Sequence, residues 1–138
     1  MEVIEVEAKI ENVIPITAKV EEIVEDHGCP DIDRINIDVA IDELFSNIVY
    51  YGYKDEVGLV WIEVESLEDP KGVELTLIDC AIPYNPLDKD DPNVDLPPEE
   101  REIGGLGIFM VKESMDEVDY EYKDGKNRLR LVKYWEEA

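Results

Sequence analysis

Cations are scarce in this 138-residue sequence, where 13 Lys and Arg stand against 36 Asp and Glu and the formal net charge is -23. A surface of this sign repels the phosphate backbone of nucleic acids and anionic lipid headgroups. We therefore expect neither nucleic acid nor membrane as a partner. A phosphate-bearing ligand could still bind if backbone N–H groups, local cations or a metal ion receive it.

Metal-binding and disulfide patterns are also missing. The two cysteines, Cys29 and Cys80, form neither a metal pattern nor a disulfide framework, so both are expected to be small core residues in a reducing cytoplasm. The single histidine, His27, has no second base or nucleophile at a telling spacing. We expect it to end a helix rather than to catalyse a reaction.

Long hydrophobic runs are absent too. The longest nearly apolar stretch, residues 103–111, is far shorter than the ~20 residues that a bilayer-spanning helix needs. Residues 1–7 alternate acidic and apolar side chains and lack the basic start and apolar core of a signal peptide. With 44% hydrophobic and 36% charged residues, the sequence predicts a soluble cytoplasmic globule that forms a single domain over residues 1–138.

The periodicity of the apolar residues predicts blocks of strands and helices. Period-two alternation indicates an opening strand near residues 2–8, and helical spacing indicates helices from Pro15 to about Gly28 and from Asp31 or Asp33 to about Tyr51. The later predicted elements are strands at 59–64 and 73–78, a proline-rich loop at 82–102, a helix carrying Ile108, Val111, Met115 and Val118, and strands at 118–122 and 129–134. This order predicts an α+β fold, a two-layer sandwich with helices on one face of a mostly antiparallel sheet.

Two polar residues share one edge of the second predicted helix. Glu43 and Asn47 are four residues apart, so their side chains lie on the same side of the helix. A carboxylate beside a neutral amide oxygen suits magnesium and water, because hard cations take oxygen ligands; solvent exposure is the alternative. Asp79 follows a predicted strand, where it could accept a hydrogen bond from an exocyclic amine or could simply be a turn residue.

A glycine run, Gly104-Gly105-Leu106-Gly107, opens the third predicted helix. Such a run presents unpaired N–H groups and the positive end of the helix dipole to phosphates, although it would also serve as a tight turn. It matches neither the P-loop pattern nor the dinucleotide fingerprint. The long loop before it is of a kind that acts as a lid or a binding loop.

Taken together, three motifs resemble those of the histidine-kinase-like ATPase (GHKL) superfamily. Glu43-Leu-Phe-Ser-Asn47 resembles its Glu-x-x-x-Asn box, Asp79-Cys-Ala-Ile-Pro-Tyr-Asn-Pro86 its Asp-x-Gly-x box, and Gly104-Gly-Leu-Gly-Ile-Phe-Met-Val-Lys112 its second glycine box. Met115-Asp116-Glu117-Val118 continues the pattern of the bacterial anti-sigma-factor serine kinases. The resemblance spans about residues 10–134 and implies a Bergerat-type ATP-binding fold.

The resemblance also implies roles for individual residues. Glu43 would act as the general base, Asn47 would bind magnesium, and Asp79 would accept the adenine amine. Further implied contacts to ATP come from Ala81, Pro83, Gly104, Gly105, Leu106, Gly107, Lys112 and Asn127, under a lid of residues 87–103. Asn127 stands roughly where many relatives carry a Thr near the adenine.

One position departs from the family pattern, because Ala81 stands where relatives carry glycine. If that backbone needed a positive φ or a close approach to the base, alanine would cost on the order of 1 kcal/mol and weaken adenine binding. The backbone N–H is retained, so binding need not be lost.

The implied function is a serine/threonine protein kinase that uses ATP and Mg²⁺ to phosphorylate a small anti-sigma-factor antagonist. A sigma factor is a further implied partner, and a homodimer is the expected assembly. From the length of the sequence we expect neither the phospho-accepting hairpin of a histidine kinase nor the transducer domain of topoisomerase and chaperone relatives. Two alternatives are a regulatory module that binds nucleotide and a protein partner, which Ala81 and the acidity favour, and an acidic domain whose motifs are coincidental.

Overall fold

Five strands form one sheet in the computed structural model, which describes residues 1–54, 56–88 and 106–136. The order across the sheet is β1-β2-β3-β5-β4, and all four neighbouring pairs are antiparallel. The strands are β1 (Glu2–Glu7), β2 (Leu59–Leu67), β3 (Gly72–Asp79), β4 (Glu117–Lys123) and β5 (Lys126–Tyr134). The expected antiparallel sheet is confirmed.

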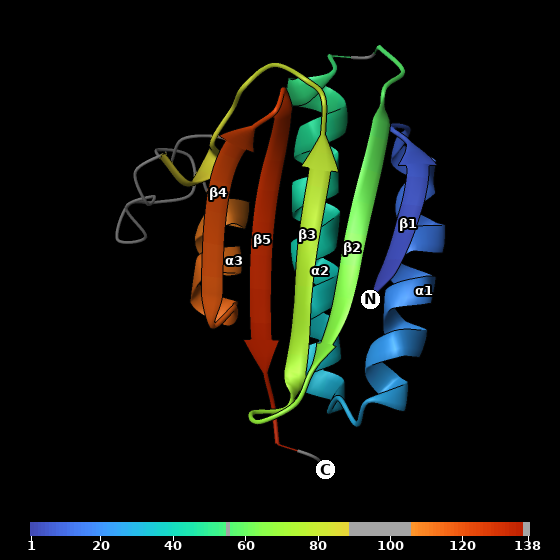
Figure 1. The fold of residues 1–138 in the computed structure, drawn as a ribbon, viewed down its shortest axis with the longest axis vertical. Helices are drawn as coiled ribbons and strands as arrows, with labels where there is room; N and C mark the ends of the chain where they lie inside the picture. Colours follow the sequence, from blue (N-terminus) through green and yellow to red (C-terminus); the bar gives the residue numbers. More distant parts are fainter. Residues whose placement is uncertain (55, 89–105, 137–138) are drawn as a thin grey trace.

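In the described part of the chain, three α-helices cover one face of this sheet and leave the other uncovered (Figure 1). They are α1 (Val13–Asp26), α2 (Asp31–Asn47), which a π-helical turn at Ile48–Gly52 extends, and α3 (Leu106–Ser114). The expected two-layer α+β sandwich is confirmed. None of the described helices is long and apolar enough to cross a membrane.

Helix α3 ends before its apolar spacing predicts. Val118 fits the helical spacing and was also predicted to begin the strand 118–122; it lies in β4, which confirms the strand. The reason is that the N–H of Asp116 already bonds the carbonyl of Val132 in β5 at 2.9 Å, so the chain joins the sheet directly after the helix.

Helix α2 supplies the centre of the core. Ile37, Ile41 and Phe45 recur at helical spacing and are all completely buried. Alternate residues of the strands, such as Ile62 and Leu75, meet them from the sheet. This packing fixes α2 against β2 and β3 and thereby fixes the position of its C-terminal end.

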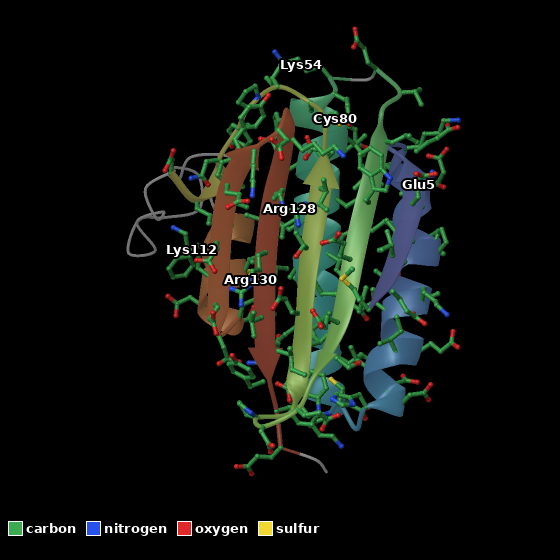
Figure 2. All side chains as sticks on the ribbon, viewed as in Figure 1. Glu5, Lys54, Cys80, Lys112, Arg128 and Arg130 are labelled. Carbon is green, nitrogen blue, oxygen red and sulfur yellow. The ribbon has the colours of Figure 1, made fainter. Side chains whose placement is uncertain are left out.

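The uncovered face of the sheet carries paired charges. Arg130 of β5 reaches Glu74, Glu117 and Asp119 with nitrogen–oxygen distances of 3.3, 3.2 and 2.7 Å. Figure 2 shows Arg130 on β5 next to Arg128, which occupies the same face two residues earlier. Part of the acidic excess is therefore neutralised on the side of the sheet that lies opposite the helices.

The two cysteines differ from each other, and the expectation that both are core residues is wrong for Cys80. Cys29 is half-buried, and burial raises the pKa of its thiol to about 11. Cys80 is exposed at the end of β3, where Figure 2 labels it. Because Asp79 faces the helices and side chains alternate along a strand, the side chain of Cys80 falls on the uncovered face.

His27 follows the end of α1, as expected.

Two acidic side chains meet between α1 and α2. Asp38 of α2 lies beside Glu21 of α1, and Oδ1 of Asp38 is buried without a hydrogen-bond partner in the described ranges. Burial, and then the neighbouring Glu21 carboxyl, raise the pKa of Asp38 to about 7. Arg34 and Glu25 join the same helices through an ion pair of 2.7 Å. Ionisation of Asp38 therefore opposes the packing of α1 on α2.

Asp38 should make the folded state less stable as the pH rises from about 4 to about 7. Its folded pKa lies above the unfolded value, so the folded state binds more protons than the unfolded state in this window, and stability is lost as the pH rises through it. Asp38→Asn should raise the unfolding free energy near neutral pH by on the order of 1 kcal/mol, a value reduced for partial solvation. Urea unfolding at acidic and neutral pH measures this. Asp42→Asn, on the exposed side of α2, is the matched control, and the same pH dependence in all three proteins would contradict the assignment.

Candidate functional site

A pocket lies at the end of the sheet where α2 finishes. The space that it encloses, counted together with the solvent open to it, is about 430 Å³. The end of α2 and the following turn form one wall, and β3, β4, β5 and the loop after β3 form the other. Polar and aromatic residues among those lining it are Asn47, Asp79, Tyr84, Tyr120 and Asn127.

The two motif residues of α2 lie one turn apart at this pocket. Asn47 lines the pocket itself. Glu43 packs against Gly107, the second residue of α3, so closely that a Cβ at position 107 would overlap its carboxylate. A side chain at 107 would therefore displace the carboxylate. The contact places an acidic group near the first turn of α3, where helical N–H groups lack intrahelical partners.

Asp79 ends β3 and is only 5% exposed. The antiparallel register sets it opposite Asn127 of β5. Its Oδ1 accepts hydrogen bonds from Nδ2 of Asn127 and from the N–H of Ala81, both at 2.9 Å. Burial raises the pKa of Asp79, and these two bonds oppose the rise because they stabilise the ionised form. Both bonds use one oxygen, so Oδ2 remains available to a donor in the pocket.

Asn127 connects Asp79 to the loop after β3. Its side chain is buried, with Nδ2 donating to the carbonyl of Ile82 at 3.0 Å as well as to Asp79. Its Oδ1 accepts from the N–H of Tyr84 at 3.1 Å and from the hydroxyl of Tyr120. One amide thus joins β3, β4, β5 and the loop.

Ala81 fits its position without backbone strain. In the described ranges, the non-glycine residues with a positive φ are Lys54, Asp69 and Asp124, and Ala81 is not one of them. The methyl group of Ala81 faces Gly52, where an added Cβ would approach it to 3.1 Å. The methyl group of Ala81 fits because residue 52 has no side chain. The positive φ considered from the sequence is not required at position 81.

The motifs give no indication of Tyr53, which fixes the end of β3. Its hydroxyl accepts a hydrogen bond from the N–H of Cys80 at 2.8 Å and donates one to the carbonyl of Leu59 at 2.7 Å. The residue therefore links the end of the π-helical turn to β2 and β3. Its place directly after Gly52, which ends the helix, is the one signal in the sequence. Tyr120 was missed too, because it fits an ordinary alternating strand.

Other residues expected at the site lie away from the pocket or outside the described residues. Those outside are Gly104, Gly105 and positions 89–103 of the expected lid. Leu106 begins α3. Pro83 is exposed and Lys112 is half-buried, and neither belongs to the described lining of the pocket. Figure 2 shows Lys112 beside β4, at the edge of the sheet.

The comparison with known families gives a match along almost the whole chain. Residues 6–133 match the sequence model described as "Histidine kinase-like ATPase domain". The chain belongs to this family. The resemblance found in the motifs is thereby confirmed. In this histidine kinase-like ATPase domain, Asn47 of α2 and Asp79 of β3, two residues of those motifs, line the pocket.

Named relatives of this domain are similar over part of their length. Serine-protein kinase RsbW of Staphylococcus aureus strains RF122 / ET3-1 and MRSA252 is 33% identical over 105 residues. The match covers 70% of this chain and 62% of each relative. A crystal structure of the RsbU and RsbW domains of Rv1364c from Mycobacterium tuberculosis has a TM-score of 0.67 at 18% identity, covering 97% of this chain and 32% of that one. The structural likeness shows the fold.

Tyr53→Phe should loosen the strand end that carries Asp79. Loss of the hydroxyl leaves the Cys80 N–H and the Leu59 carbonyl to water, so we expect a loss of about 0.5–1.5 kcal/mol in unfolding free energy. Amide hydrogen exchange at Cys80 should become faster. Tyr51→Phe, which changes an exposed ring nearby, should alter stability by less than about 0.5 kcal/mol. Unchanged exchange at Cys80 in the Tyr53 variant would show that the bond does not hold the strand end.

Proposed function

We propose that this histidine kinase-like ATPase domain binds ATP with magnesium and acts as a serine/threonine protein kinase on a small anti-sigma-factor antagonist. The observation that carries the proposal is the placement of Asn47 and Asp79 on two walls of one pocket, with Glu43 one turn away against α3. The printed name of the relatives, serine-protein kinase, supports phosphoryl transfer to a protein. The anti-sigma role rests on the sequence motifs.

The pocket has the chemistry that a purine base requires. Leu44, Leu77 and Leu129 supply apolar surface, and Asp79 supplies a carboxylate oxygen among them. A flat base packs on such surfaces, while its exocyclic amine donates to the carboxylate. Asp79 is therefore assigned to the adenine amine.

The donor set around Asn47 fits magnesium that is bound together with phosphates. In the described ranges, no cluster of three or more His, Cys, Asp or Glu could hold a metal ion. Mg²⁺ beside nucleotide phosphates commonly takes only one or two protein ligands and completes its shell with phosphate oxygens and water. The amide oxygen of Asn47 is the proposed protein ligand, and the bound ion would offset phosphate charge that the acidic chain otherwise repels.

Glu43 is the proposed general base of the transfer. Its carboxylate would take the proton of a Ser or Thr hydroxyl from the protein substrate. The hydroxyl oxygen then bonds to the γ-phosphorus of ATP, and the bond from that phosphorus to the bridging oxygen breaks to release ADP. Gly104 and Gly105, with Leu106 and Gly107, are proposed to contact the phosphates through backbone N–H groups. A sigma factor and a second copy of the chain are the further proposed partners.

Asn47→Ala should weaken the binding of ATP in the presence of magnesium by about tenfold or more, because it removes the metal ligand. Calorimetry with ATP plus Mg²⁺ and with ATP plus a chelator measures the magnesium-dependent part. Asn36→Ala removes the same side chain from the same helix three turns earlier and should leave binding unchanged. Equal magnesium dependence in wild type and Asn47→Ala would remove this residue from the site.

Glu43→Gln should retain nucleotide binding and slow phosphoryl transfer by roughly 10²–10⁴-fold, because the amide cannot accept the proton. Labelled ATP, Mg²⁺ and candidate antagonist proteins measure the transfer. Nucleotide binding by the wild type without transfer to any candidate would reject the kinase and favour a regulatory module that binds nucleotide and a protein partner. No binding of ATP at millimolar concentration would reject both functions.

A further inference from the structure

The side chain of Asn127 has no hydrogen-bonding capacity left for a ligand. It is 6% exposed, and protein groups occupy both ends of its amide. Its Nδ2 donates to Asp79 and to the carbonyl of Ile82, and approaches the carbonyl of Ala81 at 3.4 Å. Its Oδ1 accepts from Tyr84 and Tyr120. Because protein groups already use the donors and the acceptor of this amide, it can affect a ligand only by positioning those groups.

The orientation of this amide is fixed by its neighbours. A carboxylate and two carbonyl oxygens can only accept, so the amide nitrogen must face them. The backbone N–H of Tyr84 can only donate, so the amide oxygen must face it. The hydroxyl of Tyr120 donates to the same oxygen and closes the arrangement. Rotation of the amide by half a turn would oppose like groups at the carboxylate, at the carbonyls and at the N–H of Tyr84.

The fixed amide determines how Asp79 meets the pocket. Asn127 and the N–H of Ala81 hold Oδ1, which leaves Oδ2 as the oxygen open to a donor. The hydrogen bond from Asn127 also favours the ionised carboxylate against the burial that raises its pKa. An immobile carboxylate oxygen distinguishes a base that carries an amine from one that does not, because desolvation of the carboxylate without a partner is costly.

We infer that Asn127, locked by Tyr120, is a positioning residue that makes the pocket selective for 6-aminopurine nucleotides without itself contacting the base. This inference rests on the proposed binding of ATP and replaces the direct adenine contact that the motif resemblance implies for Asn127. Tyr120 belongs to β4 and Asn127 to β5, so the selectivity of a carboxylate on β3 depends on two neighbouring strands.

The test compares the affinities for ATP and for purine riboside triphosphate, which lacks the 6-amine, by calorimetry in the presence of Mg²⁺. The wild type should prefer ATP by about tenfold or more, as expected for a hydrogen bond to a charged acceptor. Asn127→Ala should lose most of this preference by weakening ATP binding alone. Tyr120→Phe, which keeps the ring and removes the lock, should give an intermediate preference.

Tyr122→Phe is the matched control, because Tyr122 is an exposed tyrosine on the same strand as Tyr120. It should retain the wild-type preference. Equal weakening of both nucleotides in Asn127→Ala and Tyr120→Phe, with the preference unchanged, would show a merely structural role and overturn the inference while leaving ATP binding intact. If Asn127→Ala does not fold, Tyr120→Phe decides. A wild type that binds neither nucleotide would overturn the proposed function and this inference together.

Discussion

The hydrogen bond from the Asn127 amide to the Asp79 carboxylate is the interaction on which the pocket depends. It forms because the antiparallel register of β3 and β5 sets these two residues side by side. A shift of one strand by one residue would turn its side chain to the opposite face, so Asn127 and Asp79 would no longer meet. The packing of α2 against β2 and β3, centred on Phe45, holds the register indirectly and keeps Asn47 facing the same space.

Charge is distributed so that a strongly acidic chain can still receive an anion. On the uncovered face, Arg130 of β5 pairs with three carboxylates, one on β3 and two on β4. On the helix face, the Glu43 carboxylate lies against the first turn of α3, and the proposed reaction uses it as a base rather than as a permanent charge beside phosphate. Phosphates would thus contact helical N–H groups and a metal ion. These short-range attractions can outweigh the repulsion from the chain's net negative charge, because salt screens that repulsion over distance.

Periodicity was sufficient to predict the sheet, its helices and the end of β3, since local spacing decides which side chains are buried. Glu43, Asn47 and Asp79 were named as candidates because each belongs to a short motif within or directly after one predicted element. Cys80 was misplaced because cysteine composition says nothing about which face follows a strand end. Tyr53 was missed because its role arises from a contact with Cys80, which is 27 residues away in the sequence. Tyr120 was missed because it fits an ordinary alternating strand, and Asp38 meets Glu21 only after α1 packs on α2.

The contact between Gly52 and Ala81 limits which substitutions these two positions can accept. The two positions share one small volume, so one of them can carry a methyl group comfortably only while the other does not. A relative with glycine at position 81 is free to gain a side chain at 52, whereas this chain must first lose its alanine. The two sites should therefore covary, although one follows a helix, the other follows a strand, and 28 residues of sequence lie between them.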